Sequence, residues 1–136
     1  MKRTIRYNET VLDHFHNPRH VGVVEAPDAE AWVSNPACGD TVRLTLRITD
    51  GVIREARFKA LGCVAAIAAA SRLTEILHGL TIIEAAGLRD AALAESLGGL
   101  PEEKVRCSVL AEKAVAEALA DHQARAGEMN QDGNGS

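Results

Sequence analysis

The sequence predicts a domain of the α+β class, because the pattern of an antiparallel β-hairpin is followed by the pattern of several helices. Apolar and polar residues alternate from Thr41 to Thr49, which is the period of a strand with one buried face. Asp50-Gly51 is a common hairpin turn, and residues 52–60 supply the returning strand. The hairpin should therefore form the sheet, with helices packed on it.

The segment before the hairpin is predicted to contain one short helix and an irregular stretch. Asn8 is a good N-cap, and apolar residues follow it at helical spacing until Asn17-Pro18 ends the run. Residues 19–37 contain one glycine and two prolines, so we expect a loop or a short strand there.

The segment after the hairpin is predicted to be helical. A helix should run from Val64 to His78 and end at Gly79. Residues 81–97 suggest one or two short helices. The last helix is predicted to begin near Pro101, and its apolar stripe extends from Cys107 to Leu119.

Length and composition limit the class of protein. The chain has 136 residues without repeat or linker, so we expect one domain over residues 1–126, followed by a disordered tail over 127–136. The net charge is −4 and no basic face is evident, which argues against nucleic-acid binding. No signal peptide or membrane-spanning run is found, so we expect a cytoplasmic protein.

The three cysteines all lie at junctions between predicted elements. Cys38 lies two residues before Asp40 in a Pro/Gly turn, Cys63 begins a helix, and Cys107 lies in the first turns of the last helix. A hairpin brings its entry and exit to one end, so Cys38 and Cys63 should be neighbours there. Cys107 joins them only if the last helix packs its start against that end. Two interpretations remain at this point: the cysteines form a shared metal or sulfur site, or they are three buried thiols with no binding role.

Four separated motifs stand out in the sequence: DHFHNPRHVG (13–22), PACGD (36–40), ARFKALGCVAAIAAAS with LTE (56–71 and 73–75), and LPEEKVRCSVLAEKAV (100–115). In these motifs the chain resembles the U-type iron–sulfur cluster assembly scaffolds, which are IscU, the N-terminal domain of NifU and SufU. The resemblance extends from Tyr7 to about Asp121.

This resemblance implies an α+β fold with a small antiparallel sheet covered on one side by helices. It also implies that Cys38, Asp40, Cys63 and Cys107 form one exposed site. In such a family the scaffold accepts sulfur from a cysteine desulfurase, binds iron, assembles a [2Fe-2S] cluster and transfers it to acceptor proteins. Cys107 matches the third family cysteine, which implies that it is the persulfide acceptor.

Two departures from the family pattern concern the same site. Arg106 stands before Cys107 where cluster-assembling members typically have histidine, and a guanidinium is not a metal ligand. We expect Arg106 to stabilise the Cys107 thiolate or to pair with Asp40. The segment LPEEK ends at Lys104, a plausible partner contact, and replaces the Leu-Pro-Pro-Val-Lys of the family. Its two acidic residues argue against dedicated chaperone binding.

Two alternatives follow from the ligand set. Three thiolates and a carboxylate also suit Zn²⁺, so the chain could be a zinc-bound sulfur-transfer protein that holds no stable cluster. Alternatively, the thiols could hold a purely structural zinc. No constellation for hydrolytic or redox catalysis is present, so we expect a scaffold or sulfur acceptor rather than an enzyme.

Other polar and aromatic residues are interpreted as structural. His14 and His16 are predicted to be surface or capping groups, as is His20. Ser71 is predicted to be a surface or packing hydroxyl, and Trp32 a local packing residue.

Overall fold

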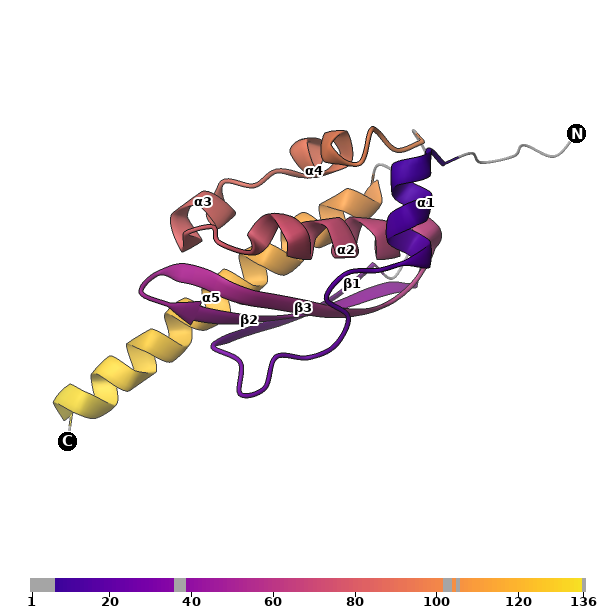
Figure 1. Cartoon of the computed structure of the whole chain (residues 1–136). Coiled ribbons are helices and arrows are strands. Elements are labelled where there is room, and N and C mark those ends of the chain that lie inside the picture. The colour runs from indigo at the N-terminus through magenta and orange to yellow at the C-terminus, as the bar shows by residue number, and fades with distance from the viewer. Residues whose placement is uncertain (1–6, 36–38, 102–103, 105, 136) are drawn as a thin grey trace, which may run out of the picture.

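The computed structural model describes residues 7–35, 39–101, 104 and 106–135, and it has the α+β architecture that the sequence predicts (Figure 1). The elements are, in chain order, α1 (Glu9–His16), β1 (Ala29–Asn35), β2 (Asp40–Thr49), β3 (Val52–Leu61), α2 (Val64–Leu77), α3 (Ile82–Ala86), α4 (Asp90–Ser96) and α5 (Arg106–Gly135).

The sheet is antiparallel with strand order β1-β2-β3. The hairpin turn falls at Asp50-Gly51, where both residues have positive φ, as a two-residue hairpin turn requires. At the opposite end of the hairpin, Asn35 pairs with Asp40, and Thr41 pairs with Leu61. The start of β2 and the end of β3 therefore lie together, which confirms the hairpin geometry predicted from the sequence.

One face of the sheet is covered by α2 and α5, and the core lies between them (Figure 1). The strands contribute large side chains such as Leu44, Leu46 and Phe58. In α2 the core positions are mostly alanine, for example Ala68 and Ala69. Small side chains let a helix approach the sheet closely, so few aromatic residues are needed to fill this core.

The other face of the sheet is only partly covered. The segment after α1 pairs with the edge strand β3, because the Gly22 N–H donates to the Phe58 carbonyl at 2.8 Å. Val24 then crosses over Thr45, and its N–H donates to the Thr45 hydroxyl at 2.9 Å. Val24 and Thr45 are both buried by this contact. Within the part of the chain that the structure describes, the remainder of this face is open around Trp32, which is 65% exposed.

The helix predictions are confirmed for most of the chain. Asn8 caps α1 by accepting from the Val11 N–H, and α2 ends at Leu77, one residue before the predicted end. Two short helices, α3 and α4, occupy the region predicted to hold one or two.

The last helix differs from the prediction at both ends. It begins at Arg106 rather than near Pro101, and a separate turn, in which the Lys104 N–H donates to the Pro101 carbonyl at 2.7 Å, precedes it. It continues to Gly135, whereas a disordered tail was predicted from Gly127. Once a helix is formed, each added residue gains a backbone hydrogen bond, so extension does not require buried side chains.

None of the helices in the described ranges combines the length and the apolar character needed to cross a bilayer.

Candidate functional site

Asp40 and Cys63 meet at the end of the sheet opposite the hairpin turn. The Cys63 backbone N–H donates to Asp40 Oδ1 at 3.1 Å, and Cys63 Sγ lies 3.7 Å from Asp40 Oδ2. Asp40 is only 2% exposed, whereas Cys63 is partly exposed. The structure thus brings together two residues that the sequence separates by 23 positions.

Local geometry holds the thiol at this position. Cys63 is the N-cap residue of α2, with extended φ and ψ, and its side chain makes no capping hydrogen bond to the helix. The carboxylate of Asp40 accepts the Cys63 N–H in addition to contacting its sulfur. A negative charge is favoured near a helix N-terminus, so the start of α2 suits both a carboxylate and a thiolate.

Gly62 makes this contact possible. A Cβ at Gly62 would lie 2.4 Å from Asp40 Oδ1 and 2.9 Å from Asp40 Cγ, which is closer than real side chains approach. The glycine is required here because the carboxylate passes directly over the backbone.

The other predicted site residues are described only in part. Cys38 lies outside the described residues. Cys107 and Arg106 lie in the first turn of α5, and only their backbone is described. Leu100, which precedes α5, packs with Cys63 against Ala65 and Ala66 at the start of α2. Figure 1 shows the first turns of α5 at the end of the molecule where α2 begins.

The described part of the site offers one soft and one hard donor. Thiolates bind iron–sulfur clusters and zinc, and a carboxylate oxygen is a harder ligand for the same ions. Within the described ranges, no three His, Cys, Asp or Glu side chains gather closely enough to hold a metal ion. Asp40 and Cys63 therefore fit one edge of a metal or cluster site, which two more donors would complete.

Comparison with known proteins gives the family. The protein-family model described as the NifU-like N-terminal domain matches residues 6–129 of this chain. The chain belongs to this family. The family predicted from the four motifs is thus confirmed.

This NifU-like domain is similar to proteins named iron–sulfur cluster assembly scaffold protein IscU. It is 42% identical over 124 residues to IscU 1 of Archaeoglobus fulgidus, covering 91% of this chain and 81% of the relative. It is also 42% identical over 125 residues to IscU of Haemophilus influenzae, covering 89% and 98%. Escherichia coli IscU is 42% identical over 123 residues, covering 88% and 95%.

Solved structures support the fold. A NifU-like N-terminal protein from Brucella abortus has a TM-score of 0.58 and 28% identity, covering 91% of this chain and 92% of that one. A protein from Fervidobacterium islandicum AW-1, assigned to cluster assembly in the SUF system, has a TM-score of 0.67. Its identity is 22%, over 83% of this chain and 96% of that one, so it supports the fold alone.

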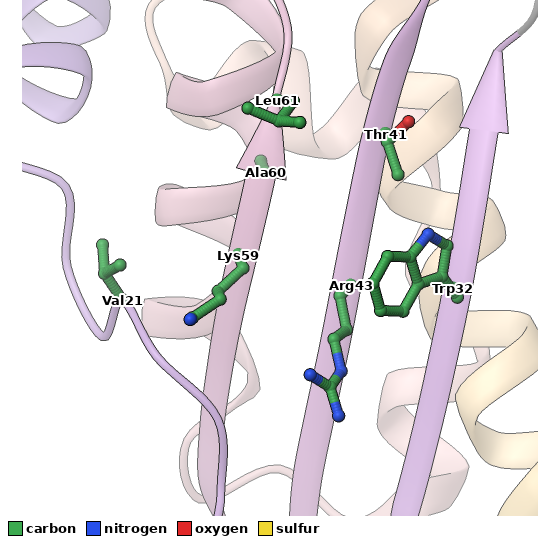
Figure 2. Close-up of a pocket in the computed structure, with 7 residues that line it drawn as sticks. All are labelled: Val21, Trp32, Thr41, Arg43, Lys59, Ala60 and Leu61. Carbon is green, nitrogen blue, oxygen red and sulfur yellow. The ribbon is translucent and has the colours of Figure 1, made fainter.

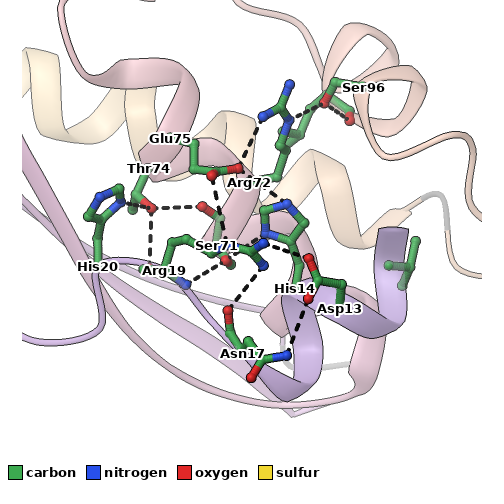
Figure 3. A network of polar contacts seen from close by, with 12 residues as sticks. Asp13, His14, Asn17, Arg19, His20, Ser71, Arg72, Thr74, Glu75 and Ser96 are labelled. Carbon is green, nitrogen blue, oxygen red and sulfur yellow. Dashed lines mark hydrogen bonds and ion pairs between the residues drawn. The ribbon is translucent and has the colours of Figure 1, made fainter. Parts of the chain in front are cut away.

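The NifU-like domain contains a second polar cluster, which sequence reasoning interpreted wrongly. His14 is 4% exposed, so its prediction as a surface or capping group is wrong. Its Nδ1 lies 2.8 Å from the Ser71 hydroxyl, and its Nε2 lies 3.2 Å from Glu75 Oε1 (Figure 3). Ser71 is fully buried and also accepts the Arg19 N–H at 2.8 Å.

These contacts are compatible with a neutral His14. The Ser71 hydroxyl accepts from the Arg19 N–H and can donate its own proton to His14 Nδ1, while Nε2–H donates to Glu75. This arrangement satisfies a neutral imidazole. Burial, together with the nearby Arg19 guanidinium, lowers the pKa of His14. The cluster joins α1 and the following loop to α2.

The cluster continues along α2 through Thr74. The Thr74 hydroxyl lies 3.1 Å from His20 Nδ1 and donates to the Ser71 carbonyl at 2.7 Å. His20 stacks on His78 with ring centroids 4.3 Å apart, so it is not simply a surface group. Burial and the neighbouring His78 lower the pKa of His20. The spacing of Ser71, Thr74 and Glu75 on one face of a helix was the only signal in the sequence for this cluster.

Trp32 of the NifU-like domain also differs from its prediction. It is 65% exposed on the sheet face turned away from α2 and α5, so it is not a packing residue of the core. The Arg43 guanidinium lies 5.3 Å from its ring centroid.

Proposed function

We propose that this chain is an iron–sulfur cluster assembly scaffold. It accepts sulfur from a cysteine desulfurase, binds iron, assembles a [2Fe-2S] cluster and transfers the cluster to acceptor proteins. The family membership and the scaffold names of relatives at 42% identity support this function. The observation that carries it is the 3.7 Å contact between the Cys63 thiol and the Asp40 carboxylate at the start of α2.

The proposed ligand set is Cys38, Asp40, Cys63 and Cys107. The described contact supports the middle pair directly. The packing of Leu100 with Cys63 supports the approach of the chain that leads to Cys107. Cys38 lies two residues before Asp40 in the sequence. The short length of chain between them keeps their α-carbons close together, whatever the local conformation.

Each residue of the set has a distinct role in this proposal. Cys107 receives sulfur as a persulfide, because it opens α5, where a thiolate is favoured by the helix N-terminus. Cys38 and Cys63 supply thiolates for iron. Asp40 is the weak ligand that lets the cluster leave, since a carboxylate is a harder donor than sulfur. Arg106 and Lys104 provide positive charge near Cys107.

The substrate ions and sulfur are cargo in this proposal, so the chain acts as a carrier and not as a turnover catalyst. Its partners are a desulfurase and cluster-accepting apo-proteins. Chaperone recognition at Leu100–Lys104 is not included, because two glutamates occupy the middle of that segment. The cytoplasmic location stays a prediction from the sequence.

The second candidate function is a zinc-bound sulfur-transfer protein, and Arg106 is the observation that favours it. With arginine in place of the family histidine, the remaining donors are three thiols and one carboxylate. This set satisfies tetrahedral zinc without a further ligand. Such a protein would relay persulfide sulfur and hold no stable cluster.

Metal and sulfide analysis of protein purified without oxygen tests the first function. We expect iron and acid-labile sulfide in equal amounts, with a visible absorption spectrum, and loss of both in Cys63→Ser. One zinc per chain without sulfide, even after incubation with iron and a desulfurase, would reject the cluster scaffold in favour of the sulfur relay.

The role of Asp40 is tested by a matched pair of substitutions in the same hairpin. Asp40→Asn removes the carboxylate at the site, and Asp50→Asn makes the same change at the hairpin turn, where asparagine tolerates the positive φ. We expect Asp40→Asn to slow cluster transfer to an apo-acceptor about tenfold and Asp50→Asn to leave it unchanged. Equal transfer rates would remove Asp40 from the mechanism.

Sulfur acceptance is tested separately. Cys107→Ser should abolish the stimulation of desulfurase turnover under both candidate functions, and a persulfide on Cys107 should be found by mass spectrometry of the trapped protein. Stimulation that survives in Cys107→Ser would contradict both.

A further inference from the structure

A hollow of about 460 Å³ lies on the sheet face that α2 and α5 do not cover (Figure 2). We call it the open sheet patch. Its lining comes from all three strands and from the segment after α1, and consists of Val21, Trp32, Thr41, Arg43, Lys59, Ala60 and Leu61. None of these residues belongs to the proposed ligand set.

The patch exposes large apolar side chains together. Leu61 is 76% exposed, Trp32 is 65% exposed and Val21 is 50% exposed. Strand register places Trp32 and Leu61 on the same sheet face, because Trp32 pairs with Arg43 and Leu61 pairs with Thr41, two residues along β2. Val21 reaches this face from the segment that pairs with Phe58 of β3. Apolar residues grouped on a surface in this way mark a binding surface more often than single exposed residues do.

The charge of the patch is positive. Arg43 lines it from β2 and is bonded to Glu30 at 2.5 Å. Lys59 pairs with Arg43 in the strand ladder and is exposed. Its ammonium group makes no hydrogen bond or ion pair within the described ranges. Among the residues that the structure describes, no carboxylate lines the hollow. The patch therefore presents one uncompensated ammonium group beside an apolar surface.

This charge selects among the possible occupants. A second copy that docked patch to patch would bring two uncompensated Lys59 ammonium groups together. A nucleic acid is held by several basic groups that neutralise its phosphates, and this patch offers one uncompensated ammonium group. An acidic protein segment that also carries an apolar side chain complements both features of the patch.

We propose that the open sheet patch is a docking surface for an acidic segment of a partner protein. A carboxylate of the segment pairs with Lys59, and a neighbouring aromatic or aliphatic side chain packs against Trp32 and Leu61. Leu61 lies two residues before Cys63 in the sequence, so a partner docked on the patch lies beside the candidate site. The patch does not require a bound cluster, so the proposal stands apart from the proposed function.

Trp32 provides the measurement, because it is the only tryptophan in the chain. The probe is the peptide acetyl-Asp-Glu-Leu-Phe-Glu-Asp-amide, and its twin carries Asn and Gln in place of the acids. We expect the acidic peptide to shift Trp32 emission to shorter wavelength and to saturate at roughly millimolar concentration. Salt at 0.5 M should weaken this response, because the ion pair is screened.

Two lysine variants separate the patch from general electrostatic attraction. Lys59→Gln should weaken binding of the acidic peptide about fivefold, whereas Lys113→Gln on the exposed face of α5 should leave it unchanged. Both variants keep Trp32, so the same signal reports on each.

Four outcomes would overturn the proposal. The uncharged twin could bind as tightly as the acidic peptide, or Lys113→Gln could weaken binding as much as Lys59→Gln. Trp32 emission could shift with protein concentration alone, together with a dimeric mass, which would make a second copy the occupant. Finally, a single-stranded oligonucleotide of ten thymidines could shift the emission while the peptide does not.

Discussion

Helix α2 carries two polar clusters, and they are built differently. At its start, Cys63 contacts Asp40 through one thiol and one backbone N–H. Near its middle, Ser71 contacts His14 and Arg19, and Glu75 contacts His14. The first cluster joins the helix to the end of the sheet, and the second joins it to α1 and the following loop (Figure 3).

The difference separates a cluster that holds the fold from one that offers ligands. In the middle of α2, each donor meets an acceptor of the same chain, and no buried side-chain nitrogen or oxygen in the described ranges lacks a partner. At the start of α2, a soft thiol and a carboxylate are held side by side by a glycine, and Cys63 is partly exposed. In the proposed function this pair binds metal or a cluster, because a thiol and a carboxylate are both ligands.

The largest effect on stability is expected in the cluster of His14, Ser71 and Glu75 near the middle of α2, which we call the middle cluster. Ser71→Ala leaves the Arg19 N–H and His14 Nδ1 without their shared partner in a buried position. Unsatisfied buried groups cost about 1–3 kcal/mol each, so the two groups together should lower the free energy of unfolding by about 2–6 kcal/mol. Urea denaturation measures it. Ser96→Ala, which removes a partly exposed hydroxyl from α4, is the control and should cost under about 1 kcal/mol.

Substitution of Gly62 tests the other cluster, at the start of α2. Gly62→Ala places a Cβ against Asp40 and must displace the carboxylate from Cys63. Overpacking of this kind costs about 1–3 kcal/mol. We expect a smaller stability loss than in Ser71→Ala but a much larger loss of iron and sulfide per folded chain. If Gly62→Ala keeps full cluster content, the contact between Asp40 and Cys63 is not part of the site.

A pH titration tests the middle cluster without changing its shape. Because burial lowers the pKa of His14 in the folded state, the unfolded chain binds more protons as the pH falls. Stability is therefore complete above the unfolded pKa of 6.5 and decreases as the pH falls below it, towards the lower folded pKa. Each such histidine contributes at most about 1.4 kcal/mol per pH unit.

The slope of the free energy of unfolding against pH shows whether His14 causes this decrease. Denaturation between pH 7 and pH 5 should show a shallower decline in His14→Gln than in the wild type. The decline should not vanish, because the pKa of His20 is lowered too. His16→Gln, an exposed position of α1, is the control. An unchanged slope in His14→Gln would mean that His14 is protonated as easily in the folded protein as in the unfolded chain.

The smallest effect is expected at the C-terminus of α5. A chain that ends at Ala126 should keep its melting temperature within about 2 °C, because the last core residues among the α5 side chains that the structure describes are Ala118 and the partly buried Leu119. It should also keep its iron and sulfide content. A drop of 5 °C or more would show that residues 127–136 contribute to the domain.

The local elements could be predicted from the sequence because their causes are local. The alternation from Thr41 to Thr49 and the Asp50-Gly51 turn fix β2, β3 and their register, and the Asn8 cap fixes the start of α1. The pairing of Asp40 with Cys63 could be expected for the same reason, since a hairpin brings its two ends together. The start of α5 was placed about five residues early, because a turn at Pro101 resembles the first turn of a helix.

The sequence by itself determined the α+β class, most element boundaries and, through four motifs, the NifU-like family. Only the tertiary structure decided that His14 is buried on Ser71 and that Trp32 is exposed. Burial depends on which surfaces pack across 50 or more residues of chain, and the spacing of residues along one element cannot supply that information. A polar residue on a helix and an aromatic residue on a strand have the same local pattern whether their face is covered or open.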